Sequence, residues 1–429
     1  MEYDRGTVLI LAGLALLVAT TAASAAMAPE RTIDRTGGET RTLVGVQGAW
    51  GGGAETGELR ALDGSKTEWR RDSADSYFEV ERLGPGRVVT SFIAGGYEEC
   101  GQFESPCART GYRVIGTDGE PTVVSEYTFP VSSKVNGEAH AVEPLPDGGF
   151  AIADMTHERL IVVENGSVVW EWRASSFYDE PPNPLETDWL HINDVDYIGE
   201  DRFLVSVRNA NQILVIERDE GVRGVINEDR LDENDGSCRR EGELDDYDGD
   251  GDVRCGDPEL IRHQHNPHWV AEGAVLVADS ENDRVVELHR QNGTWETVWT
   301  VHSPGRLRLN WPRDADRLPN GNTLITDTYN KRVVEVDDEG ELVWSASVGD
   351  NPYEADRLPG GEQVGVPRHD ENATVTRRGD TDLPVLSTVA AGLHSVVPGM
   401  PYWVGGLQVL VGLVSALLVG VGLVVRYRR

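Results

Sequence analysis

The chain repeats one kind of segment, and this repetition constrains its fold more than any other feature. In residues 140–154, 265–279 and 313–327, a charged or polar residue is followed by a turn and by an apolar run that ends in Asp. An Arg follows each Asp five positions later, and a run that contains Trp closes each unit. Repeats of about 40–50 residues that each hold several short strands are typical of β-propellers. We therefore predict an all-β propeller.

The two ends of the repeat region indicate the number of blades. Residues 42–69 contain the later strands of a blade without its first strand, whereas residues 353–366 contain an opening strand and little else. Joining the two fragments closes the ring with strands from both ends of the chain, which removes the exposed edges that a propeller cannot leave open. The sequence thus predicts a six-bladed propeller over residues 41–366, with an insertion at residues 221–262.

The segments outside the propeller predict membrane attachment. Residues 1–26 are either a signal peptide or an uncleaved transmembrane anchor, and the sequence leaves both alternatives open. Residues 401–425 are long and apolar enough to span a bilayer, and the basic tail at 426–429 is expected in the cytoplasm. Residues 27–40 and 367–400 are polar and are expected to be a tether and a linker. We therefore expect a protein of the cell membrane whose propeller lies on the extracellular face.

The charge of the chain excludes one class of partner. The formal net charge is −34, and only three of the 39 basic residues are Lys. Such an acidic, Lys-poor surface disfavours nucleic acid and suits concentrated salt, where screening weakens self-repulsion. We expect a halophilic, haloarchaeal protein; an ordinary acidic secreted protein is the alternative.

The four cysteines agree with an extracellular propeller. Cys100 and Cys107 flank a short loop, and Cys238 and Cys255 flank an acidic one. Two local disulfides are the simplest pairing. A zinc site with four Cys ligands is the rival interpretation, but neither pair has the usual CxxC spacing.

The acidic loop inside the insertion matches the pattern of an EF-hand calcium loop. Asp246, Asp248 and Asp250 occupy positions 1, 3 and 5, Gly follows at position 6, and Asp252 and Asp257 stand at positions 7 and 12. Asp in place of Glu at position 12 weakens the match, because its shorter side chain reaches bidentate coordination less easily. We expect a structural Ca²⁺ site, with a plain acidic halophilic loop as the alternative.

Aligning the blade openings predicts one cluster of functional side chains. Six residues fall at the equivalent point: Phe78, His140, Asn193, His265, Arg313 and Tyr353. His191 stands two positions before Asn193 and shares its face of the strand. Because the innermost strands of a propeller line its central channel, we expect these side chains to converge at one mouth of that channel. His268 lies further along the same segment as His265.

One repeat departs from the common pattern. Where other blades have Asp followed by Arg, the blade that opens at His191 has Val207, Arg208 and then Gln212. A rule broken in a single repeat indicates function. We expect the Asp/Arg pairs to be structural and Arg208 to be available for an anion. The alternatives are channel histidines that only bond one another and water, a transition-metal site, and a Ser-His-Asp hydrolase, which the lack of a GxSxG motif disfavours.

Three segments carry a resemblance to a known family. They are DWLHIN at residues 188–193, LVSVRNANQI at residues 204–213, and Gln264-His265 before an apolar strand. Over roughly residues 75–360 the chain resembles the arylsulfotransferase family. The resemblance implies a six-bladed propeller that moves a sulfuryl group from a phenolic sulfate donor to a phenolic acceptor without a nucleotide donor, and it implies no cofactor for catalysis.

The resemblance also implies roles for individual residues. His265 matches the histidine that is transiently sulfated, His191 and Arg208 match the residues that grip the sulfate oxygens, and His140 matches a further histidine of the anion site. We expect four more residues to contact the substrate: Asn193, His268, Arg313 and Tyr353. The C-terminal anchor, the acidic insertion and the absence of a recognisable amino-terminal dimerisation domain distinguish this chain from the better-known bacterial enzymes.

The sequence therefore predicts an aryl-sulfate sulfotransferase that works through sulfated His265. The main alternative is a propeller without catalytic activity that serves as a binding or scaffold module at the cell surface. A calcium-supported hydrolase of small esters or lactones is disfavoured, because we expect the channel to lack Glu or Asp metal ligands at the blade openings.

Overall fold

The computed structural model falls into two compact units, which we describe separately. One unit comprises residues 31–304 and 309–377; the other comprises residues 1–30, 305–308 and 378–429. The structure describes residues 4–28, 32–36, 40–48, 56–229, 235–241, 244–305, 307–349, 351–370, 375–377, 386, 389–390, 393, 400–401 and 403–428.

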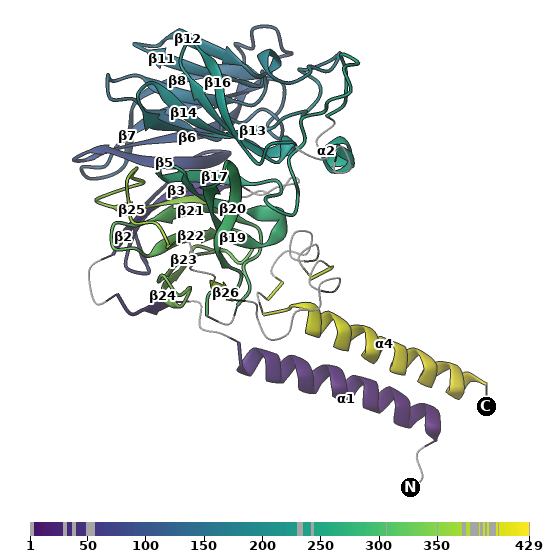
Figure 1. Ribbon diagram of the computed structural model, residues 1–429. Coiled ribbons are helices and arrows are strands. Elements are labelled where there is room, and N and C mark those ends of the chain that lie inside the picture. Colours follow the sequence, from purple (N-terminus) through teal and green to yellow (C-terminus); the bar gives the residue numbers. More distant parts are fainter. Residues whose placement is uncertain are drawn as a thin grey trace. The chain divides into compact units, whose positions relative to one another are not determined.

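The first unit is a six-bladed β-propeller, as predicted (Figure 1). Each blade is a sheet of four antiparallel strands, and the first strand of each blade contacts the first strands of its two neighbours around a ring. From the inside outward the blades consist of these strands: β25 (Asn351–Leu358), β2 (Arg41–Gln47), β3 (Gly57–Asp63) and β4 (Lys66–Ala74); β5 (Ser76–Gly84), β6 (Arg87–Tyr97), β7 (Cys107–Gly116) and β8 (Thr122–Val131); β9 (Val142–Pro144), β10 (Phe150–Asp154), β11 (Arg159–Glu164) and β12 (Ser167–Arg173); β13 (Ile192–Gly199), β14 (Arg202–Val207), β15 (Gln212–Glu217) and β16 (Gly221–Ile226); β17 (His265–Ala271), β18 (Ala274–Asp279), β19 (Arg284–Gln291) and β20 (Thr294–Val301); β21 (Pro312–Arg317), β22 (Thr323–Asp327), β23 (Arg332–Val336) and β24 (Leu342–Ser347).

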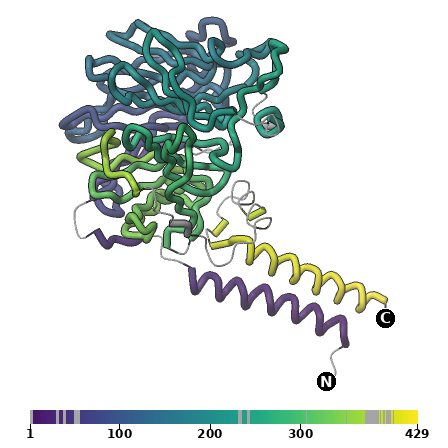
Figure 2. The backbone as a smooth tube through the Cα atoms, in the orientation of Figure 1, coloured from purple at the N-terminus to yellow at the C-terminus, as the bar shows by residue number. Residues whose placement is uncertain are grey.

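Strands from both ends of the repeat region close the ring, which confirms the prediction. β2 pairs antiparallel with β25 along its whole length, from Arg41 opposite Leu358 to Gln47 opposite Asn351. Figure 2 shows these two strands side by side although they are far apart in the sequence. Apolar side chains fill the space between neighbouring blades, and Trp189, Trp299 and Trp344 are among the largest that are fully buried.

The repeated Asp and Arg clamp the turn between the second and third strands of a blade. Arg332 lies directly opposite Asp327 in the register, and its Nε lies 2.7 Å from Asp327 Oδ2, with both side chains buried. Two other blades have the same arrangement, at Asp154 with Arg159 and at Asp279 with Arg284. In the fourth blade Val207 and Gln212 occupy these positions, and Arg208 begins a short 3₁₀ turn at Arg208–Ala210.

Two predicted boundaries were wrong. Residues 221–226 are not part of the insertion, because they form β16 and pair with β15. The sheets also extend beyond residues 41–366, since β1 (Ile33–Asp34) pairs with β24 and β26 (Val375–Arg377) pairs in parallel with β20. Of the predicted linker, residues 371–374, 378–385 and most of 387–399 lie outside the described residues, as do 29–31 and 37–39 of the tether and residue 429 of the tail.

Both predicted disulfides are present in the structure. Cys100 is joined to Cys107, and Cys238 is joined to Cys255, with Cα–Cα distances of 5.7 and 6.0 Å. The second bond ties the short helix α2 (Asp235–Glu241) to the end of the acidic loop. The insertion is thereby cross-linked within itself.

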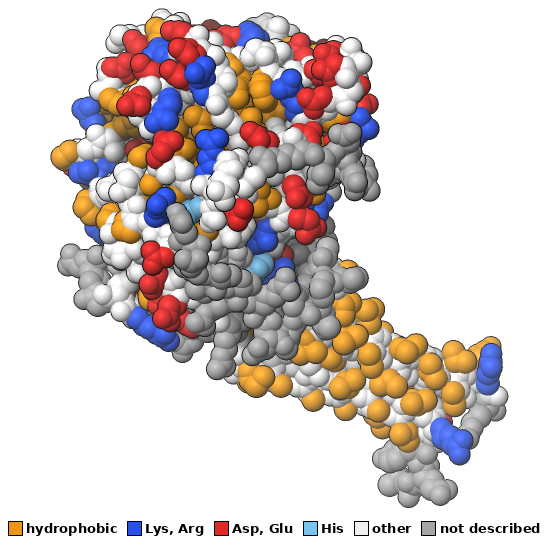
Figure 3. Space-filling model, in the orientation of Figure 1, with side chains coloured by type: hydrophobic (Ala, Val, Ile, Leu, Met, Phe, Trp, Pro, Cys, Tyr) orange, Lys and Arg blue, Asp and Glu red, His pale blue; other side chains and the backbone are white. Residues whose placement is uncertain are grey.

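The second unit contains two long apolar helices, α1 (Arg5–Ala26) and α4 (Gly406–Tyr427), which contact each other. Their backbones approach closely at small residues: a Cβ atom on Gly6 would lie 2.6 Å from the carbonyl oxygen of Gly422. At the other end Gln408 Nε2 donates to Ser24 Oγ at 2.9 Å, so the helices run antiparallel. By length and composition each can cross a membrane, and hydrophobic side chains cover their visible face (Figure 3). A signal sequence near the N-terminus has the same properties.

Candidate active site in the propeller channel

Five of the six innermost strands have an irregularity at the point where the candidate residues were aligned. The register shifts between Tyr77 and Val80 in β5, between Ile192 and Asp194 in β13, and at comparable places in β17, β21 and β25. A bulge of this kind breaks the alternation of side chains and turns one of them toward a new direction. It allows consecutive residues of one strand to face the channel.

Five of the aligned or neighbouring side chains form one contiguous group. The ring centroid of His140 lies 4.7 Å from Phe78, 5.0 Å from Tyr353 and 5.5 Å from His191. His265 joins the group through Tyr353, with the ring centroids 6.0 Å apart. Three imidazoles from different blades therefore meet as predicted, and we call His140, His191 and His265 the imidazole group.

Two arginines lie beside the imidazole group. The guanidinium carbon of Arg313 lies 4.8 Å from the ring centroid of Tyr353, and the side chain donates to Gln47 Oε1. Arg208 Nη1 donates to Asn209 Oδ1 at 2.7 Å. Among the described residues no carboxylate forms an ion pair with Arg208, although Glu281 and Asp188 act on its charge from a longer distance. Its availability for an anion stays a prediction.

Hydrogen bonds determine which nitrogen of His265 carries the proton. Nδ1 lies 2.8 Å from Ser280 Oγ and 3.2 Å from the carbonyl oxygen of His263. The Ser280 hydroxyl donates its own proton to the carbonyl of Pro312 at 2.7 Å, so it accepts from His265. Nδ1 therefore bears the hydrogen, and the lone pair of a neutral ring resides on Nε2.

His191 is held by two acidic residues. Its Nδ1 lies 2.7 Å from Asp188 Oδ2. The carboxylate of Glu158 accepts the backbone N–H groups of Leu190, His191 and Ile192 at 2.7–3.0 Å. His191 has a φ of +53°, a left-handed conformation that is rare outside Gly and is often found at functional sites. These contacts fix the ring with Nε2 free to exchange a proton.

The surroundings keep the imidazoles neutral. Burial, followed by the positive charges of Arg313 and Arg208, lowers the pKa of His265 well below its ordinary value. Burial and the neighbouring His191 and Arg313 do the same to the pKa of His140. The pKa of His191 is also lowered, by burial first, although Asp188 opposes the shift. A neutral imidazole is a competent nucleophile at neutral pH.

Partly exposed side chains surround the buried centre. His265 is 1% exposed, whereas Arg208, His191 and the rings of Trp311 and Tyr329 are partly exposed. Trp311 stacks on Tyr329 with ring centroids 4.5 Å apart, and its ring lies 5.9 Å from that of His265. This aromatic pair was missed by the sequence reasoning. Trp311 precedes Arg313 by two positions, as His191 precedes Asn193, and it has a similar φ of +54°.

Two predicted substrate contacts have other partners in the structure. Asn193 Nδ2 donates to the backbone carbonyl of Gln264 at 2.9 Å, which supports the segment that leads to His265. His268 does not join the imidazole group. Its Nδ1 accepts from the backbone N–H of Arg317 at 3.1 Å, and Nε2 lies 2.9 Å from the carbonyl oxygen of Gln363. Because His268 lies three positions after His265 on β17, its ring reaches an acidic part of the channel near Asp316 and Glu362 instead.

That acidic part corrects an expectation from the sequence. The blade openings do carry carboxylates, one and three positions after the aligned point rather than at it. Nine acidic residues occupy these positions: Glu79, Glu81, Glu143, Asp194, Asp196, Asp314, Asp316, Glu354 and Asp356. Four of the five strands that carry them, β5, β13, β21 and β25, have a bulge beside the aligned point, which allows acidic side chains to share the channel side with the imidazole group.

The structure brings together only three of the five predicted calcium ligands. Oxygens of Asp246, Asp248 and Asp250 lie within 4.8 Å of one another and of Asp179, which the sequence analysis did not single out. The N–H groups of Gly249 and Gly251 donate to Asp246 at 2.7 and 3.1 Å, which shapes the loop. Asp252 and Asp257 are outside this group: their carboxylates accept from the N–H groups of Arg254 and Glu259.

The fold and the site define a six-bladed propeller in which neutral imidazoles from neighbouring blades lie beside two arginines. Residues 140–295 match the sequence model of the family described as Arylsulfotransferase (ASST). This segment contains the complete imidazole group and Arg208. No curated protein matched the chain.

Several solved structures are similar to the chain at low identity. A protein of unknown function from Bacteroides caccae is 14% identical with a TM-score of 0.49, covering 75% of this chain and 99% of that one. A putative 6-phosphogluconolactonase from Bacteroides fragilis is 11% identical with a TM-score of 0.43, covering 76% and 99%. A virginiamycin B lyase from Staphylococcus aureus is 11% identical with a TM-score of 0.37, covering 65% and 73%.

Proposed function

We propose that the protein is an aryl-sulfate sulfotransferase that moves a sulfuryl group from a phenolic sulfate ester to a phenol through sulfated His265. The observation that carries this proposal is the lone pair on Nε2 of His265 beside Arg208 and Arg313, which form no ion pair with a carboxylate within the described part of the chain. The match of residues 140–295 to the arylsulfotransferase family supports the same reaction class.

The first step forms the sulfated enzyme. Nε2 of His265 attacks the sulfur atom, and the bond between sulfur and the phenolic oxygen breaks. Positive charge then develops on the His265 ring, and the acceptors on its Nδ1–H, Ser280 Oγ and the His263 carbonyl, stabilise it. Arg208 and Arg313 neutralise the sulfate oxygens, and the planar guanidinium matches two of them at once.

His191 moves the proton in both steps. The anionic sulfate ester lies beside the Asp188–His191 pair and favours a protonated ring while it is bound. That ring gives its proton to the departing phenolate. In the second step the acceptor phenol returns a proton to His191, its oxygen attacks sulfur, and the bond between sulfur and His265 breaks. The stacked rings of Trp311 and Tyr329 hold the aryl group at the rim.

The remaining sequence features complete the proposal. Both α1 and α4 remain in the membrane as an antiparallel pair, with Arg426 and Arg428 in the cytoplasm and the propeller outside the cell. A structural Ca²⁺ binds Asp179, Asp246, Asp248 and Asp250, an all-oxygen ligand set that suits this ion. The acidic surface keeps the protein soluble in molar salt.

The test uses the full-length chain in detergent at high salt, with 4-nitrophenyl sulfate as donor in the presence or absence of phenol. Release of nitrophenol should require phenol, and mass spectrometry after donor alone should find one sulfuryl group on His265. His265→Ala should abolish both signals, whereas His157→Asn, outside the imidazole group, should retain them. Release without phenol would instead indicate a hydrolase, and no release with several phenols would favour the scaffold alternative.

A further inference from the structure

The channel contains a group of carboxylates that sulfuryl transfer does not use. Glu79 and Glu81 lie on β5, and Glu143 lies on the neighbouring innermost strand β9. One oxygen from each of the three side chains lies within 4.8 Å of the others. We call these residues the glutamate triad. Residues two apart on a strand share a face, which explains why both glutamates of β5 are directed to one place.

Backbone N–H groups of adjacent blades orient two of the three side chains of the triad. Glu79 Oε2 accepts the N–H of Val142 at 2.7 Å, and Glu143 Oε1 accepts the N–H of Tyr197 at 3.2 Å. Glu81 Oε2 is buried and has no hydrogen-bond partner among the described residues. The triad therefore has fixed geometry and retains at least one oxygen for a ligand.

A separate buried side chain from a third blade lies near Glu79 of the triad. Asp194, on β13, is 3% exposed, and its Oδ2 has no hydrogen-bond partner within the described part of the chain. Its strongest neighbouring charges are those of Asp196 and Glu79, which are also negative. A buried carboxylate without a partner is costly, and native proteins normally satisfy such a group with a proton, a cation or water.

Neighbouring charges in this region increase that cost. Burial, then the negative charges of Asp196 and Glu81, raises the pKa of Glu79 well above its ordinary value. Burial likewise raises the pKa of Glu81 to about 7. Carboxylates packed this closely are normally compensated by shared protons or by a positive ion.

We propose that the glutamate triad and Asp194 bind one divalent metal ion of the Ca²⁺ type in the propeller channel. Four carboxylates provide only oxygen ligands, which hard cations prefer. The ion would join the innermost strands β5, β9 and β13 and would neutralise their mutual repulsion. This site is independent of the proposed transferase activity and of the acidic loop.

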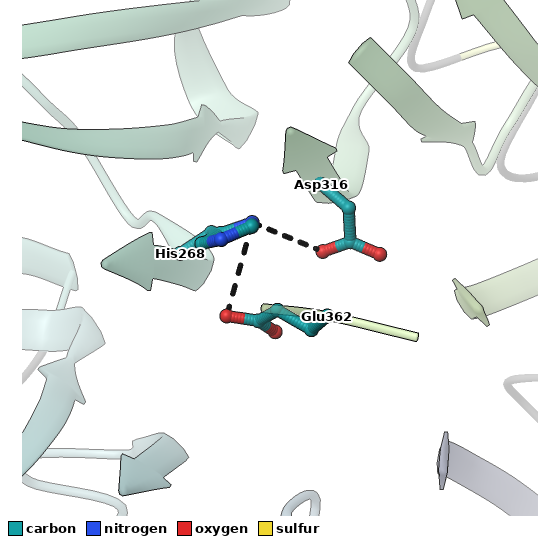
Figure 4. A group of neighbouring side chains, drawn as sticks. All are labelled: His268, Asp316 and Glu362. Atoms are coloured by element: carbon teal, nitrogen blue, oxygen red, sulfur yellow. Dashed lines mark ion pairs between the residues drawn. The ribbon is translucent and has the colours of Figure 1, made fainter. Parts of the chain in front are cut away.

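A second acidic group in the channel is a poorer metal site (Figure 4). His268 Nδ1 lies 3.7 Å from Asp316 Oδ1 and 3.8 Å from Glu362 Oε1. The same nitrogen already accepts the N–H of Arg317, so its lone pair is not available to a metal ion. The proposal is therefore restricted to the triad and Asp194.

The experiment measures Ca²⁺ binding to the full-length chain in detergent. The measurement is made in a background variant, Asp246→Asn with Asp248→Asn and Asp250→Asn. Its acidic loop lacks three of its carboxylates and should no longer bind Ca²⁺. Equilibrium dialysis with ⁴⁵Ca²⁺ after chelation should find one ion per chain in this background. Adding Glu79→Gln and Glu143→Gln should lower the affinity at least about tenfold, because two ligand charges are lost while side-chain volume is retained.

A matched control changes the same charge on the surface. Glu200→Gln with Glu272→Gln removes two carboxylates whose side chains are 87% and 77% exposed, and it should leave Ca²⁺ binding unchanged. Should the Glu79/Glu143 variant fail to fold, calorimetry of the background variant at pH 7 in two buffers provides a second test, since displacement of triad protons makes the heat depend on the buffer.

A background variant that binds no ⁴⁵Ca²⁺, or an equal affinity in the Glu79/Glu143 variant, would overturn the proposal.

Discussion

Replacing Ser280 by Ala tests how the channel activates His265. Ser280 does not belong to the predicted anion site, yet its hydroxyl lies 2.8 Å from Nδ1 of His265 and is oriented by its own bond to Pro312. The substitution removes the better of two acceptors and leaves only the His263 carbonyl at 3.2 Å. The nucleophilic Nε2 is not touched.

The magnitude follows from the charge that develops on the ring. A hydrogen bond between neutral groups contributes about 1 kcal/mol, whereas one to a charged group contributes about 1.5–3 kcal/mol. The bond therefore strengthens by about 0.5–2 kcal/mol as His265 attacks sulfur. Only an interaction that strengthens in the transition state affects kcat. At about 1.4 kcal/mol per factor of ten, Ser280→Ala should reduce kcat by about two- to thirtyfold while KM changes little.

The chain offers a matched control in the next blade. Thr328 donates its hydroxyl to the carbonyl of Pro352 at 2.9 Å, as Ser280 does to Pro312. Thr328→Ala removes the same structural bond without altering a contact of His265. The assay is single-turnover formation of sulfated His265 from 4-nitrophenyl sulfate, combined with steady-state kcat and KM. Equal losses in both variants, or a loss confined to KM, would refute the reasoning.

Three further predictions concern pH, the anion site and stability. Because burial and Arg313 lower the pKa of His265, kcat/KM should show no inflection near pH 6.5; an inflection there would mean that the ring titrates normally. Arg208→Lys should reduce kcat/KM by at least about tenfold, because an ammonium group cannot bind two sulfate oxygens in a plane, and unchanged kinetics would exclude the assigned contact. Asp327→Asn should destabilise the propeller by about 3–5 kcal/mol in urea unfolding, because it breaks a buried ion pair by removing its carboxylate. Glu68→Gln, at a pair with half-exposed side chains, should cost less than about 1 kcal/mol, and similar losses in both would contradict the assignment.

The sequence alone determined the architecture and much of the site. Repeated spacing required similar blades, and the incomplete fragments at residues 42–69 and 353–366 required closure by strands from both ends. The same alignment brought His140, His265 and Tyr353 to one place, since equivalent positions in a closed ring face the same axis. The blade that contains Arg208 has Val207 and Gln212 where other blades have Asp and Arg, and this difference indicated a special role for Arg208.

Only the tertiary structure decided what lies next to those residues. Strand bulges cannot be recognised from the alternation of side chains, and they bring carboxylates such as Glu79 and Asp194 to the channel beside the imidazole group. Other contacts join segments that are distant in sequence: Asp179 with the acidic loop, and Ser280 with both His265 and Pro312. The local pattern specifies strands and their order, whereas packing between blades determines which polar atoms become partners.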